Sequence, residues 1–424
     1  MATPTTDPAL ARMIELDARL VQAARDIRVL AHLDWPIEVG RDFLTGWKNG
    51  SPRLPEIDYR PVDYAQEIAA LQSVAEACDR GDPLGDYIHR TAQSYIIAAR
   101  MMQSRGTPEF SALSGHLYAM PGDHIGWGDL TNLDAAQHFL DATDDFRACS
   151  FLGASEFHLT AEHVADRMRT ECAAFFDRHT VDIVIDPKLP SKATAGARRI
   201  NLRGGTRYSE MDIGQLLHHE AFVHTATILN GKEQPHIKSL GLGAPRTTGA
   251  QEGLATFAEL ITGTIDLARL RRVALRIKAV HQALEGADFI DIFRFFLDAG
   301  QNEQESCLSA MRVFRGGDVR GGVAFTKDVL YLEGLIIVHT FLRKAIQQGK
   351  SDFCHRFFAG RMTLGDVVAL EPYFEAGTIA PPIYEPEWAK NRHCLAAHLL
   401  YAAFTDLLSL ETADLSEFRR SEHI

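Results

Sequence analysis

The chain has 424 residues, of which 46% are hydrophobic and 24% are charged, and its formal net charge is −12. This length and composition are typical of a globular protein with a substantial core, organised as one large domain or as two to three ordinary ones. The negative charge argues against general nucleic-acid binding, because such binding depends on basic patches that neutralise phosphates. It also provides no attraction to anionic lipid surfaces.

The six cysteines are scattered and form no CxxC pair, which is typical of reduced thiols rather than of a disulfide framework. Residues 1–7 lack the basic and apolar segments of a secretory signal. The apolar stretch at residues 395–410 carries His398 and Asp406, so it is better interpreted as a core helix than as a membrane span. The sequence therefore predicts a cytoplasmic protein whose partners include neither nucleic acid nor a membrane.

The first 175 residues are predicted to be almost wholly helical, because apolar residues recur at helical spacing. The expected helices cover residues 9–28, 62–78, 84–102, a segment that opens at about 135, and 155–178. Two stretches that contain proline and glycine, residues 36–61 and 117–124, are predicted as loops.

The pattern changes at residue 180. Residues 181–186 alternate apolar and polar side chains, and residues 199–203 form a second short strand pattern, with a predicted loop at residues 187–196 between them. A small sheet at this point would lie beside the following helix. Its edge could hold an extended peptide through main-chain pairing.

The rest of the chain again has helical patterning. One helix is predicted to begin at the N-cap Ser209, with Asp212 in a capping-box position, and to end at Asn230-Gly231. Further helices are predicted at residues 250–262, 266–285, 288–297, 303–314, 325–347 and 396–410, with a Gly- and Arg-rich loop at residues 315–322.

The helix that begins after Ser209 carries the pattern HExxxH, formed by His219, Glu220 and His224. In the metalloprotease pattern HExxH the two histidines are four residues apart and project within ~40° of each other, at ~100° per residue. Five residues apart, they project ~140° from each other. Both imidazoles can then reach one metal ion only if the helix widens locally, as a π-bulge does. The pattern indicates either a zinc site on a distorted helix or no site at all.

A catalytic zinc site has three protein ligands and one open position. His219 and His224 would provide two ligands, and Glu252 in the segment QEGLA (residues 251–255) is the expected third. Two histidines and one glutamate are the ligand set of thermolysin-like peptidases. Glu259, seven residues later on the same helix face, is predicted to accept the N–H of a ligand imidazole. We therefore expect one Zn²⁺ per chain.

HExxxH followed by a QEGLA helix resembles the QEGLA-motif family. Its bacterial members are known as flavohaemoglobin-expression modulators, and its animal relatives include the microtubule-associated tyrosine carboxypeptidase. The resemblance extends over most of the chain beyond about residue 50 and includes residues 312–317 and 325–332. It implies a zinc metallopeptidase with His219, His224 and Glu252 as metal ligands and Glu220 as the catalytic base. Dipeptidyl-peptidase III is similar in its HExxxH helix, without a wider match.

In such an enzyme, zinc activates water and polarises the scissile carbonyl, and Glu220 would take the water proton and pass it to the leaving amine. Tyr331 or an arginine is predicted as a donor to the oxyanion, although a tyrosine in this position is equally typical of a core or an interface. Because the animal relatives trim C-termini, the free carboxylate of the substrate would need a cation. Arg312, Arg315 and Lys327 are the candidates.

The sequence thus predicts a mainly α-helical α+β fold with a small β-sheet. A helical N-terminal region is expected at residues 1–175, and a zincin-like catalytic domain closed by a C-terminal helical layer at residues 176–424. The predicted function is that of a zinc-dependent carboxypeptidase acting on peptide or protein C-termini. Two alternatives stay open: a non-catalytic regulatory or interaction protein that retains a zinc site, and a metallohydrolase acting on a non-peptide amide. The presence of Glu220 argues against the regulatory alternative, because a structural metal site needs no base beside the metal.

Overall fold

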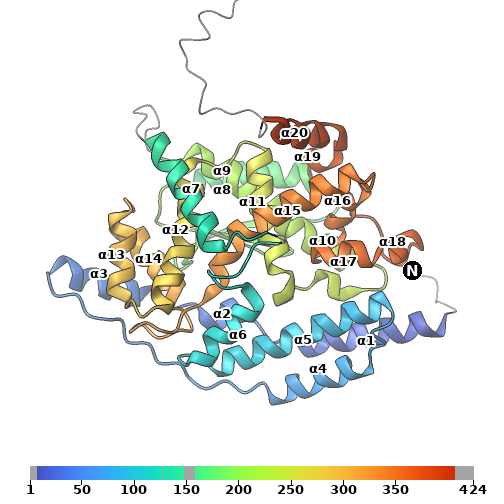
Figure 1. The fold of residues 1–424 in the computed structure, drawn as a ribbon, viewed down its shortest axis with the longest axis horizontal. Helices are drawn as coiled ribbons and strands as arrows, with labels where there is room; N and C mark the ends of the chain where they lie inside the picture. The colour runs from blue at the N-terminus through green and yellow to red at the C-terminus, as the bar shows by residue number, and fades with distance from the viewer. Residues whose placement is uncertain (1–6, 127, 148–157, 406–424) are drawn as a thin grey trace, which may run out of the picture.

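The computed structural model describes residues 7–126, 128–147 and 158–405, which form a mainly helical molecule with one small sheet (Figure 1). The predicted mainly α-helical α+β fold is therefore confirmed. Over these residues, no helix is both long enough and apolar enough to cross a membrane.

A layer of N-terminal helices lies along one side of the molecule, at the bottom of Figure 1. Two of its helices begin alike, with an aspartate whose carboxylate accepts backbone N–H groups and a proline in the first turn. This combination favours helix initiation, because it satisfies or removes amides that have no partner within the helix. The layer consists of α1 (Pro8–Ala24), α2 (Val29–Leu33), α4 (Ala65–Ala77), α5 (Pro83–Gln103) and α6 (Pro108–Tyr118).

Three further helices of the first half pack elsewhere: α3 (Ile37–Lys48) against α14 (Glu303–Phe314), α7 (Asn132–Arg147) against α12 (Leu267–Leu284), and α8 (Ala161–Phe175) against the sheet. The predicted loop at residues 36–61 is wrong in part, because it contains α3. Phe43 of α3 packs edge-to-face on Phe289 and Phe293, with ring centroids 4.8 and 5.0 Å apart. This tertiary packing outweighs the low helix propensity of the glycines in α3.

The sheet has three strands in the order β1–β3–β2. β1 (Asp182–Asp186) and β3 (Arg199–Arg203) are parallel and confirm the two predicted strands, and β2 (Ala193–Ala195) pairs antiparallel with β3. The predicted loop at residues 187–196 is therefore wrong where β2 lies. Three residues are too few to show an alternating pattern, yet they form an edge strand of the sheet.

The helix that carries HExxxH consists of α9 (Glu210–Leu216), the π-helix η1 (Leu217–Thr225) and α10 (Ala226–Glu233) in direct succession. The capping box at Ser209 and Asp212 is confirmed. The predicted end at Asn230-Gly231 is wrong. The Asn230 side chain is buried and its amide donates to two distant carbonyl groups, so it serves tertiary packing rather than helix termination.

The second half of the chain wraps the centre with helices, and its C-terminal helices lie at the right and top of Figure 1. The part of the predicted helix 396–410 beyond residue 405 lies outside the described residues. The remaining elements are η2 (Lys238–Gly241), η3 (Pro245–Thr247), α11 (Thr248–Ile261), α13 (Phe289–Asp298), η4 (Thr326–Val329), α15 (Leu330–Gln347), α16 (Asp352–Arg356), η5 (Phe357–Ala359), α17 (Leu364–Ala369), α18 (Glu371–Glu375), α19 (Glu387–Lys390) and α20 (Arg392–Thr405).

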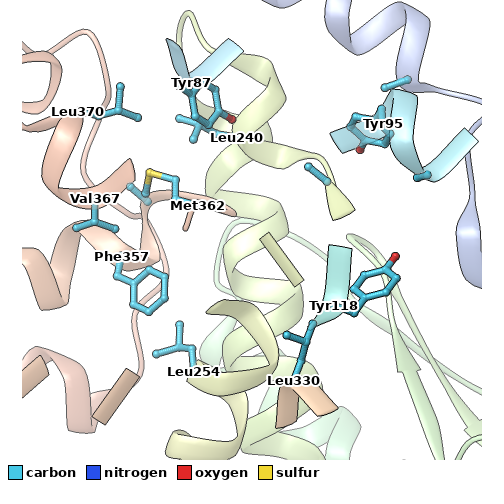
Figure 2. Packing of buried hydrophobic residues seen from close by; sticks show 14 of the residues in the cluster. Tyr87, Tyr95, Tyr118, Leu240, Leu254, Leu330, Phe357, Met362, Val367 and Leu370 are labelled. Carbon is cyan, nitrogen blue, oxygen red and sulfur yellow. The ribbon is translucent and has the colours of Figure 1, made fainter. Parts of the chain in front are cut away.

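The largest hydrophobic cluster joins helices that are far apart in the sequence. Tyr87 of α5, Leu254 of α11, Leu330 of α15 and Phe357 of η5 all belong to it (Figure 2). Its members lie on both sides of residue 175, so the N-terminal helices share a core with the rest of the chain. The division into regions 1–175 and 176–424 stays a prediction.

α11 and α15 cross at the centre of the molecule with their backbones in contact (Figure 1). A Cβ atom on Gly253 of α11 would lie 2.3 Å from the carbonyl oxygen of Gly334 of α15. A Cβ atom on Gly334 would lie 2.5 Å from the carbonyl oxygen of Gly249. No side chain fits at this crossing. Since Glu252 directly precedes Gly253, the crossing also fixes where Glu252 lies.

We predict that Gly253→Ala and Gly334→Ala each lower the free energy of unfolding by about 1–3 kcal/mol or more, because the new methyl group pushes the two helices apart. Urea denaturation measures the change. Gly365→Ala in α17 is the matched control, since its Cβ would meet only Thr363 Oγ1 at 3.8 Å. It should leave stability unchanged or raise it by up to about 1 kcal/mol. Similar effects of all three substitutions would contradict the backbone contact.

Candidate metal centre

The HExxxH motif lies on a π-helix, whose backbone hydrogen bonds run from i to i+5. A five-residue spacing therefore brings His219 and His224 to the same side of the helix. Their ring centroids are 4.8 Å apart and the rings are nearly perpendicular, at 86°. The locally widened helix expected for this motif is thus confirmed.

Glu252 on α11 faces both imidazoles. Its Oε2 atom lies 3.4 Å from His219 Nε2 and 3.6 Å from His224 Nε2. Its neighbour Gln251 is buried and accepts a hydrogen bond of 2.8 Å from Thr227 Oγ1, which ties α11 to α10. Two contacts therefore fix the position of Glu252. One is this hydrogen bond of Gln251, and the other is the crossing of α11 and α15 at Gly253.

These three side chains fit a metal ion. One ligand atom from each lies within 4.8 Å of the others. A tetrahedral zinc ion with bonds of ~2.0–2.1 Å places its ligand atoms ~3.4 Å apart, close to the two distances that Glu252 makes. Glu252 Oε2 is buried without a hydrogen-bond partner among the described residues. Leaving such an oxygen unsatisfied is costly, and a cation at this point would satisfy it.

Glu259 supports His219 from behind. Its Oε1 atom lies 2.6 Å from His219 Nδ1, and Arg269 contacts both of its carboxylate oxygens at 3.2 and 3.3 Å. Burial acts to raise the pKa of Glu259, but the charge of Arg269 and the His219 hydrogen bond lower it to about 2. Glu259 is therefore a carboxylate that accepts the Nδ1 proton, which leaves Nε2 of His219 free to bind a metal.

The two histidines differ in their proton affinity. Burial acts to lower the pKa of His219, but the nearby carboxylates of Glu252 and Glu259 outweigh it and raise the pKa to about 10. At His224 burial dominates and the pKa is lowered. His218, the remaining histidine of this helix turn, packs edge-to-face on Phe222 and lies outside the cluster.

Lys327 forms an ion pair with Glu252. Its Nζ atom lies 2.7 Å from Glu252 Oε1 and 3.5 Å from the Tyr331 hydroxyl. Burial acts to raise the pKa of Glu252, but the charge of Lys327 and the close approach of the two imidazoles hold it well below the usual value. Glu252 is therefore ionised, as a metal ligand must be.

Glu220 lines a cavity of about 300 Å³ together with His219, His224 and Glu252. Across the part of the chain that the structure describes, no residue hydrogen-bonds its carboxylate. The edge strand β2 forms one wall of this cavity, and Leu30, Asp34 and Trp35 contribute a second wall from the N-terminal region. The N-terminal helices therefore help to shape the site.

The three predicted carboxylate-binding cations all line this cavity, and each is held in an ion pair. Arg312 binds both oxygens of Asp328, at 2.5 and 2.9 Å. Arg315 lies 3.0 Å from Asp34, and Lys327 is bound to Glu252. Their role in binding substrate stays a prediction.

Four other arginines near the site were not among the residues predicted from the sequence. Arg361 lines the cavity of about 300 Å³, and Arg269, Arg272 and Arg276 of α12 line a smaller cavity beside it. The three arginines of α12 could have been recognised from the sequence. Their i, i+3, i+7 spacing within the predicted helix 266–285 puts three cations on one face.

The family of the chain follows from comparison with known proteins. The family model described as microtubule-associated tyrosine carboxypeptidase matches residues 43–406. The chain belongs to this family. The resemblance predicted from HExxxH and QEGLA is thereby confirmed, and the match includes every site residue from His219 to Arg361. The name of the microtubule-associated tyrosine carboxypeptidase family implies a carboxypeptidase. No curated protein matches the chain in sequence.

We predict that Glu259→Gln weakens zinc binding by about 10- to 100-fold, because the amide no longer fixes the His219 ring as a carboxylate does. Competition with a chromophoric chelator measures the affinity. Glu385→Gln is the matched control: Glu385 is also buried and lies 2.8 Å from the Nδ1 atom of a histidine, His355, which is not part of the cluster. Equal losses in both variants would contradict a specific role of Glu259.

Proposed function

We propose that this protein is a zinc-dependent carboxypeptidase that trims peptide or protein C-termini, with a zincin-like site. The strongest support is the convergence of His219, His224 and Glu252 beside the carboxylate of Glu220, which has no partner among the described residues. The membership in a family named for a carboxypeptidase supports it independently.

The donor set favours a catalytic over a structural metal. Structural zinc sites are usually closed by four protein ligands, often cysteines, whereas catalytic sites have three ligands of the kind found here. Zinc bound by His219, His224 and Glu252 would supply Lewis-acid chemistry for hydrolysis. The cavity beside these residues gives a substrate access to them.

Glu220 is suited to be the general base, because it directly follows a proposed ligand histidine and lines the cavity with no partner in the described part of the chain. It would accept a proton from the attacking water and deliver it to the leaving amine. Tyr331 would donate its hydroxyl proton to the oxyanion. Its ring lies beneath two cations, with Lys327 Nζ 5.0 Å and Arg269 5.9 Å from the ring centroid, which holds the hydroxyl at the cavity.

The edge strand β2 offers a template for the substrate main chain. The segment that contains β2 makes a backbone hydrogen bond to the segment of β3 on each side of Thr194, and these two hydrogen bonds are 2.9 and 2.8 Å long. In this antiparallel register the N–H groups of Ala193 and Ala195 point away from β3. Both residues line the cavity, so an extended peptide could pair with them.

We predict that purified protein contains about one zinc per chain, that His219→Ala loses it, and that Glu220→Gln keeps it. Glu220→Gln should lower the rate of C-terminal residue release by about 10²–10⁴-fold, because the general base is removed. A peptide library analysed by mass spectrometry measures the release. Glu210→Gln, an exposed glutamate on the same helical segment, is the control and should behave as wild type.

Turnover that survives Glu220→Gln would contradict this mechanism. Absence of turnover in wild type, with zinc present, would instead support the non-catalytic regulatory alternative. Release of a product from a non-peptide amide, with no peptide cleaved, would support the remaining alternative.

For Tyr331→Phe we expect kcat to fall by about 10²–10³-fold with KM and zinc content nearly unchanged, since a donor to the oxyanion acts mainly in the transition state. The aromatic ring stays, so its packing against Lys327 and Arg269 is preserved. A variant with wild-type kcat would exclude Tyr331 from this role.

A further inference from the structure

A small chamber beside the metal centre is unusually rich in positive charge for a chain of net charge −12. The chamber has a volume of about 140 Å³ and is lined by His219, Glu220 and Tyr331 on the side of the metal centre. α12 lines the other side with Arg269, Arg272 and Arg276. At ~30 Å³ per water, this volume is that of about five water molecules, so it is suited to one residue rather than to a longer peptide.

Most cations of the chamber have an acidic partner. The four pairs are Arg269–Glu259 (3.2 Å), Arg312–Asp328 (2.5 Å), Arg203–Glu305 (2.8 Å) and Lys192–Asp212 (2.7 Å). Each of these acids is matched by a cation, so the pairs contribute little net charge to the chamber.

Among the described residues, Arg272 has no such partner and Arg276 has only a distant one, which another arginine already binds. Arg276 is only 9% exposed, its Nε atom has no hydrogen bond among the described residues, and its nearest carboxylate oxygen, on Asp328, is 3.7 Å away and already bound by Arg312. For Arg272, the described portion of the chain supplies neither a hydrogen bond nor an ion pair. Two guanidinium groups thus face the chamber with unused donors.

The surroundings of both arginines are unfavourable for a lone cation. Burial and the neighbouring arginines lower the pKa of Arg276 to about 9, and burial and Arg269 lower the pKa of Arg272. An anion in the chamber would offset this cost, because a buried charge is stabilised only when it is paired and hydrogen-bonded. A carboxylate is a suitable anion, since a guanidinium can bind both of its oxygens.

The proposed reaction determines on which side of the metal centre the leaving residue of the substrate must lie. Glu220 delivers a proton to the leaving amine, so the residue that leaves must lie on the Glu220 side of the scissile bond. Glu220 lines the chamber and also the cavity of about 300 Å³ that Arg361 lines, but it does not line the neighbouring cavity of about 360 Å³ that Glu252 and Arg361 share. The α-carboxylate of the leaving residue is only a few bonds from its amine, so it would fall in the chamber.

We propose that Arg272 and Arg276 bind the free α-carboxylate of the last residue of the substrate and thereby restrict the enzyme to releasing one residue per cycle. This inference rests on the proposed carboxypeptidase function. It assigns carboxylate recognition to Arg272 and Arg276, whose donors are unused, rather than to Arg312, Arg315 or Lys327, which are held by acidic side chains. Arg361 also has a buried Nε atom without a hydrogen bond among the described residues, but it does not line the chamber.

The test compares a peptide ending in tyrosine, the residue in the family's name, made with a free C-terminal carboxylate and as the C-terminal amide. Wild type should strongly prefer the free acid. Arg276→Met and Arg272→Met should each raise KM for the acid by about 10- to 100-fold, the loss expected for a hydrogen bond to a charged group. The rate with the amide should stay unchanged, and Arg276→Lys should retain part of the preference.

Arg271→Met is the matched control. Arg271 is the neighbour of Arg272 on α12, but it points to α7, where it binds Asp144 at 2.6 Å. It should keep the wild-type preference for the acid. If the Arg272 and Arg276 variants lost activity equally toward the acid and the amide, their role would be merely structural and the proposal would be overturned. An unchanged preference for the acid in these variants would also overturn it.

A binding measurement separates this proposal from the proposed function. Calorimetric titration of zinc-loaded, full-length Glu220→Gln protein with N-acetyl-L-tyrosine and with its amide needs no turnover. Tighter binding of the acid, lost on adding Arg272→Met, supports the carboxylate site even if wild type cleaves no peptide. Equal binding of acid and amide overturns it. Arg272 is partly exposed, so its variant serves if Arg276→Met does not fold.

Discussion

The five-residue spacing of His219 and His224 is the constraint on which the site depends. On a regular α-helix these side chains diverge, and no single ion could bind both. The π-helix η1 (Leu217–Thr225) removes this divergence and leaves Glu220 between them, facing the cavity. The helix is buried on its other side, where residues such as Ala221 and Val223 have no exposed surface, so the surrounding core holds the unusual backbone in place.

The second fixed element is the crossing of α11 and α15. Gly253 and Gly334 bring the two backbones together, and the residue before Gly253 is Glu252, the proposed third ligand. Lys327 lies on η4, directly before α15, and its Nζ atom contacts Glu252. One packing contact therefore positions both a ligand and the cation that keeps it ionised. Glu259, further along α11, then orients His219.

The sequence predicted the parts of the site that depend on spacing within one segment. HExxxH, QEGLA and the position of Glu259 are of this kind, and so are the strands β1 and β3. It could not predict contacts between distant segments, such as those of Arg315 with Asp34 or of α3 with Phe289. The edge strand β2 was too short to leave a pattern. The arginines of α12 did leave one, but only burial distinguishes an arginine in a cleft from one on a solvated helix face.

We propose that two imidazoles and one carboxylate hold a single zinc ion. Anomalous X-ray diffraction at the zinc absorption edge, on crystals of the purified protein, tests this proposal. We expect one strong peak at ~2.0–2.2 Å from His219 Nε2, His224 Nε2 and Glu252, with a fourth position open to the cavity. A peak elsewhere, or none at these residues in protein that contains zinc, would contradict it.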